Sequence, residues 1–84
     1  MTKKEKLIQR LRSKPNDFTW NELVSLLGHF GFDFVNAGKT SGSRVRFVHQ
    51  GYPPMILHKP HPTSILKKYQ LENIIDFLEQ ENLL

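Results

Sequence analysis

Residues 32–59, FDFVNAGKTSGSRVRFVHQGYPPMILHK, decide the fold of this chain of 84 residues. Apolar and polar side chains alternate in the segments FDFVNA, SRVRFVH and PMILHK, and turn-forming residues fill the intervening GKTSG and QGYP. This alternation predicts three short strands, because successive side chains of a strand point to opposite faces of a sheet. We expect the second and third strands to form an antiparallel hairpin.

A helix is expected immediately before these strands. Thr19 and Glu22 form a T-x-x-E capping box, and Phe18 and Leu23 stand where a hydrophobic staple would clamp the helix start. Apolar residues then recur at i, i+3, i+4 and i+7 as far as residue 30, and Gly31 suits a left-handed helix end. These signals bound the helix at both ends.

Two further helices complete the chain. Apolar residues at helical spacing predict one over residues 3–14, which Pro15 ends, and another over residues 69–80. The order α-α-β-β-β-α predicts an α+β fold, in which a three-stranded antiparallel sheet packs on helices on one face and leaves the other face open. We expect a single domain over residues 1–84, with residues 1–14 as an N-terminal basic extension.

The open face of the sheet should carry the functional side chains. In the second strand, Val45 and Phe47 alternate with Arg44 and Arg46, so the two arginines should point away from the core.

The third strand allows two orientations. Either Met55 and Leu57 face inward, or Ile56 and His58 do. Burying Met and Leu is favoured by about 2 kcal/mol, the transfer free energy of one large side chain. We therefore expect His58 on the open face beside the arginines, which requires a hairpin loop of odd length.

Positive charge is concentrated in the middle of the chain. The net charge is +4, and residues 38–62 contain no Asp or Glu but hold four cations and three histidines: Lys39, Arg44, Arg46, Lys59, His49, His58 and His61. Clustered cations indicate a polyanionic partner, and imidazoles among them allow acid/base chemistry on it. The alternatives are a solvated surface and a docking face for an acidic protein. A metal site is disfavoured, since neither cysteine nor an organised carboxylate accompanies the histidines.

Several classes of protein are excluded or disfavoured by what the sequence lacks. Without cysteine it forms no disulfides or thiolate zinc site, and no apolar run reaches the roughly 20 residues of a membrane span. We expect a cytoplasmic protein. Nucleotide-hydrolase, serine-esterase, zincin and dinucleotide motifs are all missing. The Gly-rich loop with Ser41 and Ser43 either cradles a phosphate or simply connects strands.

Three segments together resemble one known family. LLGHFGFDFV, GKTSGSRVRF and LHKPHP are similar to the HicA family of toxins, the YcfA-like mRNA interferases of bacterial toxin–antitoxin loci, and the likeness runs roughly over residues 20–84. The resemblance implies a fold similar to the double-stranded-RNA-binding domain and metal-independent endoribonuclease activity on mRNA, without a small-molecule cofactor. It also implies neutralisation by a HicB-type antitoxin.

The resemblance does not supply the catalytic histidine. In the best-known form of the family a histidine follows the Gly-Ser step, whereas Arg44 follows Gly42-Ser43 here. The residues present support another scheme, in which His58 is the base and Arg44 and Arg46 stabilise the phosphorane. The remaining proton or RNA contacts would come from Lys39, Ser43, Lys59 and His61. The alternative is an RNA-binding module of the same fold without activity.

Overall fold

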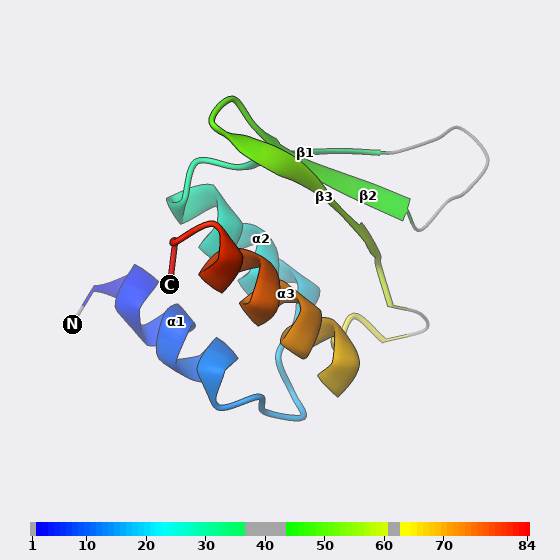
Figure 1. Ribbon diagram of the computed structural model, residues 1–84. Coiled ribbons are helices and arrows are strands. Elements are labelled where there is room, and N and C mark those ends of the chain that lie inside the picture. The colour runs from blue at the N-terminus through cyan, green and yellow to red at the C-terminus, as the bar shows by residue number, and fades with distance from the viewer. Residues whose placement is uncertain (1, 37–43, 61–62) are drawn as a thin grey trace.

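The computed structural model describes residues 2–36, 44–60 and 63–84, and its elements follow the order expected from the sequence (Figure 1). Two helices come first, three strands follow and a third helix ends the series: α1 Lys3–Arg12, α2 Trp20–His29, β1 Asp33–Asn36, β2 Arg44–His49, β3 Tyr52–His58 and α3 Lys68–Gln80. No helix in these ranges combines the length and the apolar character needed to cross a membrane.

The sheet and the helices form two layers. The strands are antiparallel in the order β1-β2-β3, and all three helices lie on one side of the sheet (Figure 1). One apolar cluster lies between the layers and among the helices, and it draws residues from all three helices, from β2 and β3 and from the connections. Its fully buried large side chains are Leu11, Phe18, Leu23, Leu26, Leu27, Phe47, Leu71, Ile74 and Leu78. The α+β fold expected from the sequence is confirmed.

The start of α2 is the capping box that the sequence predicts. The Thr19 hydroxyl accepts a hydrogen bond from the backbone N–H of Glu22 (3.2 Å), and Oε1 of Glu22 accepts one from the N–H of Thr19 (3.0 Å). Phe18 and Leu23 are both fully buried at the positions of a hydrophobic staple.

The end of α2 is fixed by Gly31, which has a φ of +92°. The N–H of Gly31 donates to Gly28 (3.0 Å) and the N–H of Phe32 donates to Leu27 (2.9 Å), the pair of bonds that defines a Schellman motif. A Cβ at this position would also lie 3.0 Å from Nε2 of His49. Only glycine satisfies both the backbone angle and the close approach.

The hairpin between β2 and β3 differs from expectation in its loop. The turn consists of Gln50 and Gly51, an even number of residues, so the predicted loop of odd length is wrong. The extra residue is absorbed by a β-bulge, because Phe47 pairs with Met55 whereas His49 pairs with Tyr52. Sequence alternation fixes which side chains face inward but cannot distinguish an odd loop from a bulge.

The bulge explains why β3 starts earlier than expected. The strand includes Pro53 and Pro54, which the sequence pattern assigns to the turn or to the first strand position. Proline lacks an N–H and is tolerated at bulges and in edge strands, and β3 is an edge strand.

The first helix is shorter than the sequence predicts. It ends at Arg12 and not at residue 14, because Lys14 adopts a φ of +50° before Pro15.

Candidate functional site: the basic end of the open sheet face

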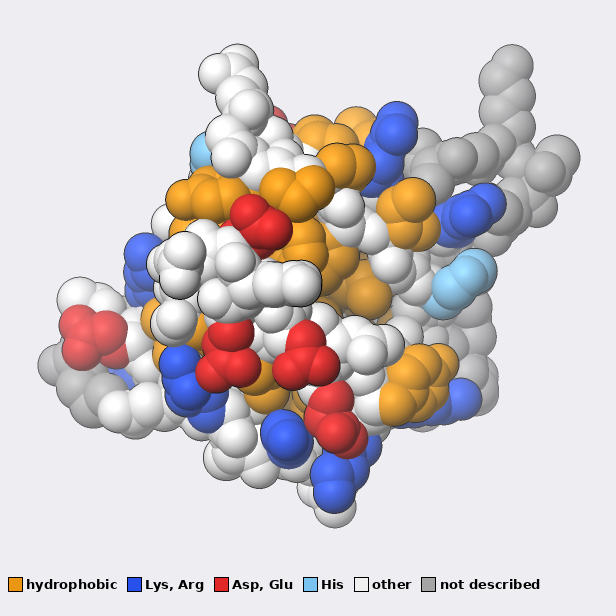
Figure 2. All heavy atoms as spheres, viewed as in Figure 1, with side chains coloured by type: hydrophobic (Ala, Val, Ile, Leu, Met, Phe, Trp, Pro, Cys, Tyr) orange, Lys and Arg blue, Asp and Glu red, His pale blue; other side chains and the backbone are white. Residues whose placement is uncertain are grey.

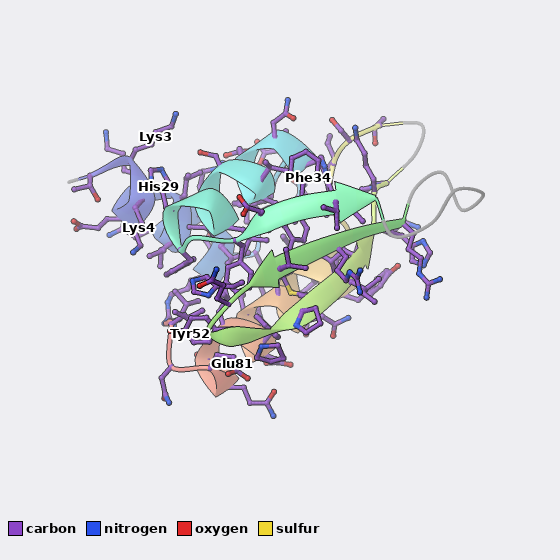
Figure 3. All side chains as sticks on the ribbon, turned by 90° about the horizontal axis from the view of Figure 1, so that it is seen from above. Lys3, Lys4, His29, Phe34, Tyr52 and Glu81 are labelled. Atoms are coloured by element: carbon purple, nitrogen blue, oxygen red, sulfur yellow. The ribbon has the colours of Figure 1, made fainter. Side chains whose placement is uncertain are left out.

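The sheet face that the helices leave open is the surface seen in Figure 3. Along β2, exposed Arg44 and Arg46 alternate with buried Val45 and Phe47. Along β3, Met55 and Leu57 are each 8% exposed and face the core, whereas His58 is exposed. The inward and outward assignments made from the sequence are therefore confirmed for both strands.

His58 and Arg44 lie directly opposite each other. They are Cα partners in the β2–β3 ladder, and Arg46 is the next residue of β2 on the same face. Directly opposed residues of an antiparallel pair have Cβ atoms about 5 Å apart, and residues i and i+2 of one strand are about 7 Å apart. One imidazole and two guanidinium groups can therefore converge on a single phosphate.

A row of apolar side chains crosses the face beside this group. Val35 of β1 and Ile56 of β3 are the two partners of Arg46, and they are 43% and 47% exposed. Apolar surface on both sides of a cation suits a ribose or a base attached to a phosphate. Sequence reasoning did not select these two residues, although their register opposite Arg46 places them on the same face.

Ion pairs occur on the helical side of the molecule. Arg10 pairs with Asp17 (3.2 Å) and Glu22 (2.7 Å), and Arg12 pairs with Glu79 (3.6 Å). Within the described ranges no carboxylate pairs with Arg44 or Arg46. Figure 2 shows acidic side chains gathered over α3, where the exposed carboxylates are Glu72, Asp76 and Glu79. The positive charge of the sheet face is thus available to an external anion.

The structure does not place all the predicted site residues. Lys39, Ser43 and His61, with the rest of the Gly-rich loop, lie outside the described residues. Lys59 is described, is exposed and follows His58 directly, beyond the end of β3.

His49 lies at the other end of the sheet and does not join His58. Its ring packs against Phe32 and Tyr52, with centroids 5.1 and 4.8 Å apart, and its Nδ1 accepts a hydrogen bond from the N–H of Gly51 (2.9 Å). A hollow of about 530 Å³ lies beside it, lined by Gly31, Asp33, Val48, His49 and Gln50. This histidine shapes the hairpin turn.

The backbone of His58 is held by a side chain that sequence reasoning missed. Nε2 of Gln70, in the first turn of α3, donates a hydrogen bond to the carbonyl oxygen of His58 (3.0 Å). Oε1 of the same side chain accepts one from the N–H of Lys67 (3.0 Å). No local sequence pattern indicates such a contact, because residues 58 and 70 are brought together only by the fold.

In the part of the chain that the structure describes, no three His, Asp or Glu side chains gather closely enough to hold a metal ion.

Comparison with known proteins gives a family. Neither the curated proteins nor the solved structures contain a match, so the likeness to a double-stranded-RNA-binding domain stays a prediction. The family model for the HicA toxin of bacterial toxin–antitoxin systems matches residues 20–81. The match begins at the first residue of α2 and includes the whole sheet and α3, whereas α1 precedes it. Because it spans most of the chain, the protein belongs to the HicA family of bacterial toxins.

Proposed function

We propose that this toxin is a metal-independent endoribonuclease that cleaves mRNA in the cytoplasm, with its active centre at His58, Arg44 and Arg46. The observation that supports the proposal is the exposed imidazole of β3 opposite an exposed guanidinium of β2, on a face whose arginines have no carboxylate partner among the described residues. A HicB-type antitoxin is the proposed protein partner, in keeping with the family.

The proposed reaction is attack by the RNA on its own backbone. Neutral His58 takes the proton of a ribose 2′-hydroxyl, the 2′-oxygen forms a bond to phosphorus, and the bond from phosphorus to the 5′-oxygen breaks. Arg44 and Arg46 stabilise the added negative charge of the pentacoordinate phosphorus. The products are a 2′,3′-cyclic phosphate and a 5′-hydroxyl.

The leaving 5′-oxygen needs a proton. In this scheme Lys39 or His61 supplies it or makes the remaining phosphate contact, while Ser43 and Lys59 bind the neighbouring backbone. Of these four residues only Lys59 lies within the described ranges. Val35 and Ile56 would contact the ribose or base beside the reacting phosphate.

The test is cleavage of a defined RNA in the presence of EDTA, with analysis of the fragment ends. We expect cyclic-phosphate ends from the wild-type chain and a loss of at least about 100-fold in rate for His58→Ala, the lower range for removal of a general base. His29→Ala is the matched control, because His29 is an exposed histidine of α2 at the other side of the molecule (Figure 3). Unchanged cleavage by the His58 variant would disprove the assignment.

A second candidate is an RNA-binding module without activity. It is favoured by Arg44, which stands where the best-known members of the family carry a histidine. That candidate predicts RNA binding that weakens with salt and leaves the RNA intact, so the same incubation distinguishes the two.

A further inference from the structure

Gln70 is an unusual residue of the core. Among the described residues it is the one polar side chain that is buried, with 5% of its surface exposed. Burying an amide is unfavourable unless the amide forms hydrogen bonds. Here its oxygen and its nitrogen are both engaged, the oxygen with the N–H of Lys67 and the nitrogen with the carbonyl of His58. The side chain thus connects the start of α3 to the end of β3.

His58 needs such a connection because of its place in the sheet. It is the last residue of an edge strand, so β2 supports it from one side only. Among the described residues that follow, Ser64 accepts a backbone hydrogen bond from Trp20 (2.7 Å) and Leu66 donates one to Phe18 (2.8 Å). Among the described hydrogen bonds outside the sheet, the bond from Gln70 is the one that reaches His58.

We propose that Gln70 is a positioning residue for His58: by holding the His58 carbonyl it keeps the imidazole opposite Arg44. This inference rests on the proposed function, in which His58 is the base. Gln70 is buried, so it contributes to the chemical step and not to RNA binding. Loss of the contact should lower kcat about tenfold to 100-fold, the effect of a small misplacement of a reacting group, and leave KM nearly unchanged.

Gln70→Glu separates this role from capping of the helix. The introduced carboxylate can still accept the N–H of Lys67, and a negative charge near a helix N-terminus is favourable, so α3 should form. An ionised carboxylate cannot donate to the His58 carbonyl. Gln80→Glu is the matched control, because it makes the same chemical change at an exposed position at the other end of α3. Gln70→Met is a second variant, which removes both hydrogen bonds without adding charge.

The pH dependence gives a second readout, taken at pH values where urea unfolding shows that the Gln70→Glu variant is fully folded. Once protonated, the introduced carboxyl group regains a donor, and burial raises the pKa of such a group. We therefore expect the ratio of the kcat of the Gln70→Glu variant to that of the wild type to rise as the pH is lowered from about 7 to about 5. The Gln80→Glu variant should keep a constant ratio close to one.

A spectroscopic measurement is independent of cleavage. The NMR signals of the His58 ring, assigned with the His58→Ala variant, should broaden or shift in both Gln70 variants and not in the control. Unchanged ring signals in the Gln70 variants would overturn the role of Gln70. If the wild-type chain cleaves RNA, an unchanged kcat in these variants would overturn it as well. If the wild-type chain does not cleave RNA, the proposed function fails, and the ring signals still decide whether Gln70 holds His58.

Discussion

An ion pair with two hydrogen bonds joins the first two helices. Arg10 donates from Nε to Oε2 of Glu22 (2.7 Å) and from Nη2 to Oε1 (3.0 Å). These hydrogen bonds hold the pKa of Glu22 below its usual value and raise the pKa of Arg10. Because Glu22 also caps α2, one carboxylate stabilises the helix start and its attachment to α1.

This pair gives a prediction for stability against pH. A depressed pKa in the folded state means that the carboxylate stabilises the fold above its unfolded pKa of about 4.3, and the contribution is lost as the pH falls through the lower folded pKa. Glu22→Gln keeps a capping acceptor but removes the charge. It should cost about 1 kcal/mol at neutral pH, a modest value because both side chains of the ion pair are partly exposed.

Urea unfolding of the wild type and the Glu22→Gln variant at several pH values measures this difference. The gap in unfolding free energy should narrow as the solution becomes acidic. Glu72→Gln, on the exposed face of α3, is the control and should show little difference at any pH. A gap for Glu22→Gln that does not depend on pH would contradict the assignment.

The residues that sequence analysis identified correctly are those with local signals. Thr19, Glu22 and Gly31 could be predicted because a capping box and a left-handed helix end involve residues only a few positions apart. Gln70 and Arg10 could not, since their partners lie 12 residues away along the chain. Only the folded backbone brings such pairs together.

Among the elements, α1 lies outside the range that the family model matches but inside the core. Leu11 is fully buried, Leu7 is 7% exposed, and Lys4 lies 4.5 Å from the centre of the Phe30 ring. The sequence predicts that residues 1–14 are an N-terminal extension of the domain. We propose that α1, within this extension, stabilises the fold although the matched family region begins after it.

Leu11→Ala tests this proposal. Removing a fully buried leucine side chain leaves a cavity and should lower the unfolding free energy by about 2–5 kcal/mol. Gln9→Ala, at an exposed position of the same helix, should have almost no effect. Thermal or urea unfolding gives both values. If the two variants had the same unfolding free energy, the proposal that α1 stabilises the fold would be wrong.

The hairpin shows what periodicity can and cannot determine. Alternation correctly placed Met55 and Leu57 in the core and His58 outside, because the apolar side chains must share one face. It did not reveal the β-bulge at Pro53 and Pro54, since a bulge changes the count of residues without changing which side chains face inward beyond it.

At the scale of the molecule, charge is distributed unevenly. The sheet face presents Arg44 and Arg46, whereas the outer face of α3 is acidic (Figure 2). If RNA binds the sheet face, each arginine that contacts a phosphate contributes to the salt dependence of binding.

Arg44→Ala and Arg46→Ala should therefore each reduce the slope of log Kd against log salt concentration by about 0.7 to 1. Lys3→Ala, an exposed cation of α1, is the control and should leave the slope unchanged. Fluorescence anisotropy with a labelled single-stranded RNA measures the slopes. Equal reductions for all three variants would indicate diffuse attraction and would contradict a site on the sheet.

The family and the fold could be read from the sequence, but the chemistry could not be assigned in full. The family depends on motifs of consecutive residues, which the match over residues 20–81 supports. The proposed active centre depends on which distant groups converge. Sequence patterns place His58, Arg44 and Arg46 on one face of the sheet, whereas the apolar neighbours Val35 and Ile56 and the hydrogen bond from Gln70 become visible only in the folded chain.

The place of α3, beneath the sheet but after it in the sequence, has a consequence for how the protein is made. The β2–β3 hairpin can form from neighbouring residues, yet the apolar layer beneath it includes α3, which is synthesised after the sheet. Contacts between such distant parts of a chain slow folding. A nascent chain on the ribosome therefore lacks part of the apolar layer beneath the sheet until α3 has been synthesised, and the side chain of Gln70 can hold the end of β3 only from that moment.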